Sequence, residues 1–253
     1  PSEIRKYVNL SDFCRHHGIR LHWVNRFSES IPYPVYLNNQ FPYAVYSELR
    51  EPLLLPENRI LKRSFDILVS SLLIIFCLSW MFPIISLIIL LESRGPIFFR
   101  QKRTGVDNQT FHCLKFRTMK VNDHADEKQA VKNDARVTRF GRFLRHSSID
   151  EFPQLLNVLI GNMSIVGPRP HMLKHTEDYS SIFGSYRVRH YVKPGITGWA
   201  QINGCRGEIT HPDHLKARIV RDLWYIEHWS IGLDCKILWL TFYNMIKGDK
   251  HAF

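Results

Sequence analysis

The chain has 253 residues and a formal net charge of +11, from 34 Lys and Arg against 23 Asp and Glu. That length can bury a substantial core and predicts one main domain with additional segments. The positive charge favours an anionic partner, whether nucleic acid, an acidic membrane surface or a phosphorylated substrate. The 5 cysteines are scattered without a CxxC pair, so neither a disulfide framework nor a zinc site is supported, and a reducing, cytosolic setting fits best.

The first 58 residues read as a unit of their own. Leu10–His17 predicts a short helix, Gly18 its end, and Arg20–Val24 a strand. Prolines then interrupt the chain and indicate a linker. The chain starts at Pro1 with no initiator Met and no signal-peptide pattern, so we expect a fragment of a longer protein that carries the end of an α/β domain.

The stretch from Ile67 to Leu91 contains no charged residue and consists mostly of Leu, Ile, Val and Phe. As a straight helix it would measure roughly 37 Å at about 1.5 Å per residue, whereas a bilayer core is about 30 Å thick. A soluble helix of this length normally has a polar face. The stretch therefore favours membrane insertion over a buried core helix.

Basic residues flank both ends of this apolar run: Arg59, Lys62 and Arg63 before it, and Arg94, Arg100, Lys102 and Arg103 after it. A spanning helix normally has its basic flank on one side, so this pattern favours a helix whose two ends return to the cytosolic face. Pro83 removes one helical hydrogen bond and bends the helix, and Ser79, one turn earlier, can satisfy a freed carbonyl. An ordinary kinked spanning helix explains the same residues equally well.

Beyond the apolar run, the pattern predicts a hairpin from residues 96–100 and 110–116, with Asp107 and Asn108 at the turn. Residues 121–135 are polar and predict a mobile loop or an exposed helix. Ser148 is expected to cap an amphipathic helix that has Glu151 at its third position and ends at Gly161.

Residues 214–246 predict a helix near the end of the chain. Aromatic side chains are spread along it: Trp224, Tyr225, Trp229, Trp239 and Tyr243. Such rings are favoured both at a membrane interface and in a protein core, and the sequence gives the two locations equal weight.

Two adjacent carboxylates, Asp150 and Glu151, follow a basic run formed by Arg139, Arg142, Arg145 and His146. Acidic residues in a first helical turn complement the helix dipole, which by itself is the more frequent reason for such a pair. Phosphoryl transfer, however, needs a nucleophile, a cation-binding carboxylate and basic side chains for the phosphate. Neighbouring helical residues point about 100° apart, so one carboxylate can face a phosphorus atom while the other reaches a metal ion.

Further basic residues lie in Gly- and Pro-shaped turns, including Lys115, Arg117, Arg136 and Arg169. Arg suits two-pronged contacts with phosphate. Any one of these groups is more often a solvated face, but together, beside a membrane segment, they predict a phosphate site. The chain has no GxSxG, Walker or HExxH motif, and His146, His190 and His228 are expected to be structural.

Several motifs occur in order along most of the chain: KRSFD (62–66), GPIFFRQKRTG (95–105), KFRTM (115–119), DARVTRFGRFLRHSSIDEFPQLLNVLIGNMSIVGPRP (134–170), KPGITGWAQINGCRGE (193–208) and DLWYIEHWSIGLD (222–234). In these motifs the chain resembles the bacterial polyprenyl-phosphate sugar-1-phosphate transferases, or monotopic phosphoglycosyl transferases. One departure is that Ser-Pro is usually adjacent in the membrane helix of that family, whereas here Ser79 and Pro83 are separated by three residues. Phe152 stands where Leu is commoner.

The resemblance implies an α+β fold with a mainly helical catalytic domain and a re-entrant membrane helix. Residues 1–58 would be the end of an α/β nucleotide-fold domain plus linker, residues 59–94 the re-entrant helix with its flanks, and residues 95–253 the cytosolic catalytic domain. The protein would lie in the bacterial inner (cytoplasmic) membrane, with its catalytic domain on the cytosolic face.

The resemblance also implies a two-step reaction. Asp150 would attack the sugar-bearing phosphate of a UDP-sugar, release UMP and hold the sugar phosphate covalently until undecaprenyl phosphate removes it. Glu151 would bind Mg²⁺. Arg145 and Arg169 match positions linked to phosphate or nucleotide binding, and we add Lys115, Arg117 and Arg136 as candidate donor-binding residues.

The expected partners are therefore a UDP-sugar, undecaprenyl phosphate and membrane phospholipid, in the first membrane step of exopolysaccharide, capsule or O-antigen assembly. Neither the sugar nor self-association into a homodimer is decided by the sequence. The alternative is a catalytically silent membrane-tethered scaffold or binding protein of the same fold. Nucleic-acid binding is not expected, because no recognised motif for it occurs.

Overall fold

The computed structural model describes residues 2–24, 36–38, 45–121, 134–205, 207, 209 and 211–247. These residues are mostly helical with small sheets, which confirms the α+β expectation in its coarse form. The α-helices among these residues are α1 (Ser2–His17), α2 (Pro56–Leu73), α3 (Ser79–Glu92), α4 (Arg139–His146), α5 (Gln154–Ile160), α6 (Leu173–Ile182), α7 (Trp199–Ile202), α8 (Pro212–Glu227) and α9 (Ile231–Lys247). Short helical turns are η2 (Pro52–Leu54), η3 (Ile74–Leu78), η4 (Val106–Asn108), η5 (Ile149–Glu151) and η6 (Tyr186–Tyr191).

The strands form three small sheets in the described residues. β1 (His22–Val24), β3 (Val45–Ser47) and β2 (Tyr36–Asn38) pair antiparallel in that order. β4 (Phe98–Thr104) and β5 (Thr110–Phe116) form an antiparallel hairpin, and β6 (Ser164–Val166) pairs parallel with β7 (Gly195–Thr197).

The N-terminal segment contains the predicted helix, stop and strand. α1 is longer than predicted but ends at His17, and Gly18 follows it with a φ of 68°, a conformation that glycine adopts without steric cost. The nucleotide-fold remnant stays a prediction, because the described strands here pair antiparallel. The division of the chain at residues 58 and 94 also stays a prediction; α2 itself begins at Pro56.

The apolar run lies within one helical stretch from Pro56 to Glu92, the one described helix long and apolar enough to cross a membrane. Its most apolar 18-residue window has a mean hydropathy of 2.7, and only 22% of that window is buried. Phe76 and Leu91 are 68% and 78% exposed. A core helix would be covered by the rest of the chain, so the low burial argues against that alternative.

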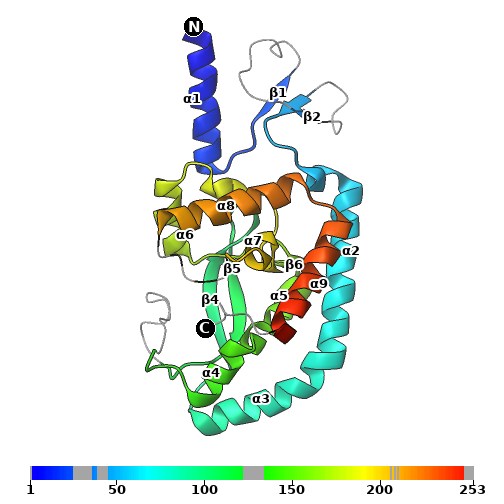
Figure 1. Cartoon of the computed structure of the whole chain (residues 1–253), viewed down its shortest axis with the longest axis vertical. Coiled ribbons are helices and arrows are strands. Elements are labelled where there is room, and N and C mark those ends of the chain that lie inside the picture. The colour runs from blue at the N-terminus through cyan, green and yellow to red at the C-terminus, as the bar shows by residue number, and fades with distance from the viewer. Residues whose placement is uncertain are drawn as a thin grey trace.

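The helical stretch changes direction between α2 and α3, and Figure 1 shows the two arms framing the domain along its side and its lower edge. The change occurs at a π-helical turn, η3, in which Ser79 N donates to Ile74 O, five residues back. The carbonyl of Ile75, which loses its usual partner, accepts the Ser79 hydroxyl instead at 2.5 Å. Ser79 therefore binds a backbone carbonyl with its hydroxyl, as expected. The change of helix direction, however, lies before Pro83, which stays inside α3.

The predicted hairpin is confirmed. Asp107 and Asn108 have φ values of 49° and 60° at its turn, as short polar side chains tolerate. The single helix predicted for residues 214–246 is in fact two, α8 and α9, separated by residues 228–230. Of the polar segment 121–135, residues 122–133 lie outside the described residues.

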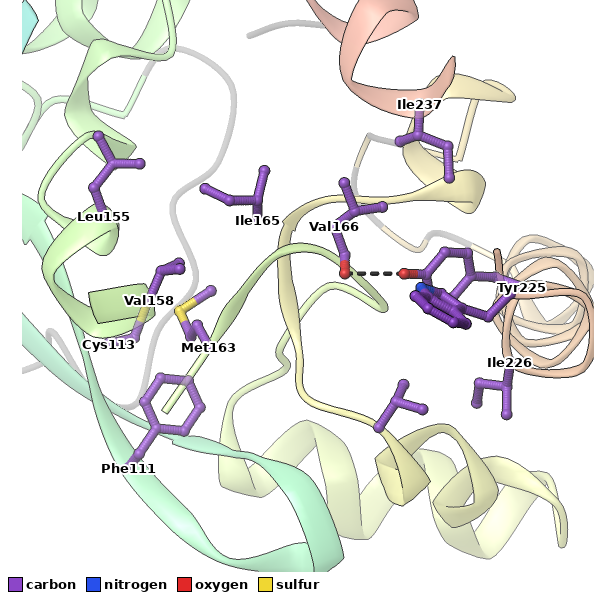
Figure 2. Packing of buried hydrophobic residues seen from close by; sticks show 12 residues of the cluster. Phe111, Cys113, Leu155, Val158, Met163, Ile165, Val166, Tyr225, Ile226 and Ile237 are labelled. Carbon is purple, nitrogen blue, oxygen red and sulfur yellow. Dashed lines mark hydrogen bonds between the residues drawn. The ribbon is translucent and has the colours of Figure 1, made fainter. Parts of the chain in front are cut away.

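The main core joins the hairpin, β6 and the two last helices. Figure 2 shows Cys113, Val158 and Ile165 packed in one cluster with Tyr225 and Ile237. Tyr225 and Trp229 are 1% and 5% exposed and belong to this core. Trp224, Trp239 and Tyr243 are 36%, 67% and 51% exposed, so the core explanation fails for these three, and their location at a membrane interface stays a prediction.

Three glycines let the segment after β6 lie directly against β7 and the turn that follows it. A Cβ added to Gly195 would lie 2.1 Å from Gly167 N, and one added to Gly198 would lie 2.2 Å from Gly167 O. Real Cβ atoms do not come that close to backbone, so a side chain at either position would push the two segments apart. This close contact matters because Gly167 leads into Pro168 and Arg169.

We predict that Gly195→Ala destabilises the protein by about 1–3 kcal/mol or more, because the inserted methyl group overpacks a backbone contact. The free energy of unfolding can be measured by chemical denaturation in detergent. Gly232→Ala in α9 is the matched control, since nothing lies within 4 Å of its added Cβ; it should be neutral or stabilise by up to about 1 kcal/mol. Equal effects of the two substitutions would contradict the close approach.

Candidate active site

The two adjacent carboxylates lie in a tight turn between α4 and α5. α4 begins at a Thr138 cap, whose hydroxyl accepts from Gly141 N at 3.0 Å. At the other end of α4, Ser148 has a φ of 58° and makes no side-chain cap hydrogen bond. The predicted capping role of Ser148 is wrong, because an N-cap needs an extended backbone and Ser148 is left-handed. The chain then makes the η5 turn, and α5 begins only at Gln154.

Glu151 is held by two basic side chains from distant parts of the chain. Lys115 Nζ lies 2.6 Å from its Oε1. Arg169 donates from NH1 to Oε2 at 3.1 Å and from NH2 to Oε1 at 2.5 Å. Although burial opposes ionisation, Arg169 and Lys115 hold the pKa of Glu151 well below its usual range. Glu151 is therefore a fixed carboxylate.

Asp150 has a different environment, although it is the next residue. Its side chain is buried, and its nearest cation is Lys115, with Nζ 4.0 Å from Oδ2. Burial raises the pKa of Asp150 to about 6, and the negative charge of Glu151 adds to this rise, whereas Lys115, Arg145 and Arg169 oppose it. The site thus contains one fixed carboxylate and one carboxyl that ionises near neutral pH, a combination typical of acid–base or nucleophilic chemistry.

Arg169 is constrained at both its side chain and its backbone. It lies between Pro168 and Pro170, which restrict the backbone on either side. Its carbonyl accepts from Arg189 NH2 at 2.8 Å. Arg189 is itself 2% exposed and pairs with Asp222 at 2.7 Å. The guanidinium that contacts Glu151 is therefore supported by a second, fully buried ion pair.

The structure separates the predicted donor-binding residues into two groups. Lys115, Arg145 and Arg169 lie near the carboxylate pair, and Arg145 is fixed by its Nε donating to Thr118 Oγ1 at 2.8 Å. Arg117 instead donates to the carbonyls of Ser93 and Arg94, at 2.6 and 2.8 Å, after the end of α3. Arg136 forms an ion pair with Asp134 at 2.6 Å.

A buried network fastens α2, the first arm of the apolar helical stretch, to β6, the strand that precedes Arg169. Lys62 pairs with Asp234 at 2.7 Å and donates to Val166 O at 2.9 Å. Asp66 accepts from Ser164 Oγ and from the backbone N of Ile165, each at 2.9 Å. Tyr225 also donates to Val166 O at 3.1 Å, as drawn in Figure 2.

Sequence reasoning missed three residues of the site region: Arg103, Arg189 and Arg218. Arg103 donates to Pro170 O at 2.5 Å, next to Arg169. None of the three stands beside the acidic pair in the sequence. The only signal was that Arg103 lies within one of the motifs, GPIFFRQKRTG (95–105).

Asp150 and Glu151 carry the oxygen ligands that Mg²⁺ prefers, and because both Glu151 oxygens accept from Lys115 or Arg169, an ion bound there would share Glu151 with these two cations. Mg²⁺ is usually bound by one or two carboxylates together with substrate phosphate oxygens. Among the residues described, no group of three or more His, Cys, Asp or Glu side chains could hold a metal ion. An ion at this site would therefore depend on Asp150 or Glu151 and on a phosphorylated substrate.

The ordered sequence motifs and the residues of this site correspond to a known family. The sequence model of the family described as bacterial sugar transferase matches residues 57–248. The chain belongs to this family.

Individual relatives agree with the assignment. The chain is 53% identical over 165 residues to a UDP-glucose:undecaprenyl-phosphate glucose-1-phosphate transferase of Xanthomonas campestris pv. campestris, which covers 64% of this chain and 34% of the relative. It is 50% identical over 188 residues to a Klebsiella pneumoniae protein of the same name, covering 74% of this chain and 40% of the relative. The match to the exopolysaccharide production protein PSS of Rhizobium leguminosarum bv. phaseoli is 42% over 196 residues and covers 76% of this chain and 98% of the relative. The chain thus spans well under half the length of the first two.

We predict that Asp150→Asn stabilises the protein at neutral pH by about 1–3 kcal/mol. The folded-state pKa of Asp150, about 6, lies above the unfolded value of about 3.9, so folding favours the protonated carboxyl. That stability is present at low pH and is lost as the pH rises from about 4 to about 6. Asn cannot ionise, so the advantage of the variant in Tm should develop over this interval and stay constant above it.

Glu151→Gln provides the matched control, because it should change stability in the opposite direction. Its pKa is depressed by Arg169 and Lys115, so the ion pairs stabilise the fold at neutral pH and are lost with the substitution. Thermal unfolding of both variants between pH 4 and pH 8 tests the assignment. A loss of stability in Asp150→Asn at neutral pH would contradict it.

Proposed function

We propose that this chain transfers a sugar-1-phosphate from a UDP-sugar to undecaprenyl phosphate. The observation that carries the proposal is the buried Asp150, whose pKa is raised to about 6 beside the fixed carboxylate of Glu151 and the cations Lys115, Arg145 and Arg169. The names of the Xanthomonas and Klebsiella relatives support both substrates, and UDP-glucose is the first donor to test.

In the first step, a carboxylate oxygen of Asp150 attacks the phosphorus that bears the sugar. The bond between this phosphorus and the bridging oxygen breaks, and UMP leaves with the electron pair. In the second step, a phosphate oxygen of undecaprenyl phosphate attacks the same phosphorus, and the Asp150 carboxylate is released. With a pKa of about 6, most Asp150 side chains are ionised at pH 7, and the burial that raises this pKa also removes water from the carboxylate, which makes it a better nucleophile.

The basic residues neutralise the negative charge of the phosphate oxygens in both steps. Lys115 and Arg169 are held by Glu151 at fixed positions, so their charge is in place before the phosphate arrives. Arg145, fixed by Thr118, lies on the side of Asp150. A magnesium ion bound by Glu151 would further neutralise phosphate charge when present.

We further propose that the apolar run is re-entrant and lies in the cytosolic leaflet of the inner membrane. Its first arm is fastened to the catalytic domain through Lys62 and Asp234. Its far end is fastened to the same domain through Arg117, which binds two carbonyls after α3, and through Glu92, which accepts from Phe140 N at 3.1 Å. A spanning helix would carry these two ends to opposite faces of the bilayer, and one folded domain cannot contact both. Phospholipid would cover the exposed apolar side chains.

This placement puts the reaction at the membrane surface, where undecaprenyl phosphate presents its phosphate. It supports a role in the first membrane step of polysaccharide assembly, and the name of the Rhizobium relative agrees with such a role.

The test measures UMP release from UDP-glucose by the purified protein with Mg²⁺ and without lipid acceptor. We expect a stoichiometric burst of UMP and a hexose-phosphate adduct on the peptide that contains Asp150, followed by turnover when undecaprenyl phosphate is added. Asp150→Asn should abolish the burst and the adduct, and removal of Mg²⁺ should slow both steps.

Arg136→Gln is a control for general damage, because Arg136 pairs with Asp134 rather than with the carboxylate pair; it should keep a burst. Lipid-linked product without any adduct would refute the covalent route. No product from any UDP-sugar in a panel would favour a scaffold of the same fold.

The topology is tested with single cysteines in a variant whose 5 native cysteines are replaced by serine. Glu57→Cys and Arg94→Cys mark the two exposed ends of the helical stretch. Both should react with a membrane-impermeant maleimide only after the cytosol is made accessible. Phe76→Cys, near the bend, should stay unlabelled until detergent is added. Labelling of one end from outside intact cells would mean that the helix spans the membrane.

A further inference from the structure

Arg218 is a buried cation that takes no part in the reaction steps proposed above. It lies in α8 and is 8% exposed. NH2 donates to Gly207 O at 2.7 Å, and NH1 lies 3.4 Å from His171 Nε2. Its Nε is buried without any hydrogen-bond partner. Arg218 makes no ion pair within the described part of the chain.

The surroundings of Arg218 contain more positive than negative charge. The positive charges of Arg103, Arg189 and Arg218 all lower the pKa of His171. The carboxylate of this group, Asp222, accepts from Arg189 through both Nε and NH2, at 3.1 and 2.7 Å. Burial, with these arginines beside it, keeps the pKa of His171 well below its ordinary value, so the imidazole adds no charge of its own. A buried charge without an ion-pair partner is costly, and an anion bound beside the described members of this cluster would offset that cost.

The cluster is connected to the carboxylate pair through a short series of contacts. Glu151 binds the Arg169 side chain, and the Arg169 carbonyl accepts from Arg189. Arg189 NH1 lies 3.0 Å from His171 Nδ1, and the other ring nitrogen faces Arg218. The positive charge of Arg169 lowers the pKa of Arg218. Arg169 also lowers the pKa of Asp150, together with Lys115 and Arg145. Arg169 thus lies between two groups of cations, one at Asp150 and one at Arg218.

A nucleoside diphosphate sugar carries two phosphates that need separate charge neutralisation. The phosphate under attack must lie at Asp150, within reach of Lys115 and Arg145. In an in-line displacement the leaving oxygen lies opposite the nucleophile, so the second phosphate is directed away from Asp150. The unpaired guanidinium beyond Arg169 suits that second phosphate.

We propose that Arg218 binds the phosphate of the departing nucleoside monophosphate, a subsite distinct from the one at Asp150. The inference rests on the proposed function for the identity of the nucleotide. Arg218 holds the loop at Gly207 with NH2 and keeps Nε free for a phosphate oxygen. Through Arg169, which neighbours both subsites, binding at Arg218 would also help to orient the phosphate that reacts.

The experiment compares binding of UMP and of uridine to the wild-type protein and to Arg218→Gln by isothermal titration calorimetry. UMP should bind the variant about ten- to hundred-fold more weakly, the effect of removing one charged hydrogen bond to a phosphate. Uridine has no phosphate, so its affinity should be unchanged. Arg218→Lys, which keeps the charge without the planar fork, should bind UMP with intermediate affinity.

Arg221→Gln is the matched control, because Arg221 lies one turn along the same helix and donates to its own helix at Ala217 O; it should bind UMP as the wild type does. Thermal unfolding without ligand separates binding from folding. Because Arg218 is buried without an ion-pair partner among the described residues, Arg218→Gln should keep or raise Tm, whereas substitution of a structural arginine would lower it.

Unchanged UMP affinity in Arg218→Gln would overturn the inference, and so would a loss of UMP affinity accompanied by a lowered Tm or by an equal loss for uridine. Wild-type protein that binds no UMP would overturn it as well. A failure of the proposed function has a different signature: UMP binds through Arg218, yet no UDP-sugar gives a lipid-linked product.

Discussion

The ion triad of Glu151 with Lys115 and Arg169 is the interaction on which the site depends. Its members come from three separate places: the end of the hairpin, the segment after β6, and the turn before α5. Because the carboxylate of Glu151 is shared by both cations, each is fixed relative to the other before any substrate binds. The same sharing leaves Asp150, among the described residues, with one ion-pair contact, to Lys115 at 4.0 Å, and Lys115 lies closer to Glu151. One carboxylate thus organises the charge, and its neighbour remains available for chemistry.

The apolar helical stretch from Pro56 to Glu92 is part of this construction. Lys62 and Asp66 reach from its first arm to β6, and β6 leads directly to Arg169. The second arm is fastened after its end by Arg117, which follows Lys115 closely in the chain. Each cation of the triad therefore lies a few residues from a contact with the apolar helix. A displacement of that helix would therefore move both cations that hold Glu151, Lys115 and Arg169.

The sequence predicted the features that depend on neighbouring residues in the chain, and it did not predict those that depend on packing between distant segments. The hairpin turn at Asp107 and the helix stop at Gly161 follow from short-range rules, and both are present. Asp150, Glu151, Lys115 and Arg169 stood out because motifs surround them. Ser148 was misjudged because a left-handed backbone cannot be recognised from a serine alone. Arg189 and Asp222 pair although they are 33 positions apart in the sequence. This pair could not be predicted, because no local sequence pattern indicates that η6 packs against α8.

The arginines behind Arg169 show why the interior of this domain tolerates so much positive charge. Asp222 compensates Arg189, and this pair fixes the Arg169 backbone, so its burial has a structural purpose. Arg103 and Arg218 receive no such compensation among the described residues. In a domain that only had to fold, such groups would be replaced by apolar or neutral side chains at little cost. Under the proposed function the ligand is a nucleoside diphosphate sugar, whose phosphates would supply the missing negative charge on binding, so the stability lost in the ligand-free protein would be recovered as binding affinity.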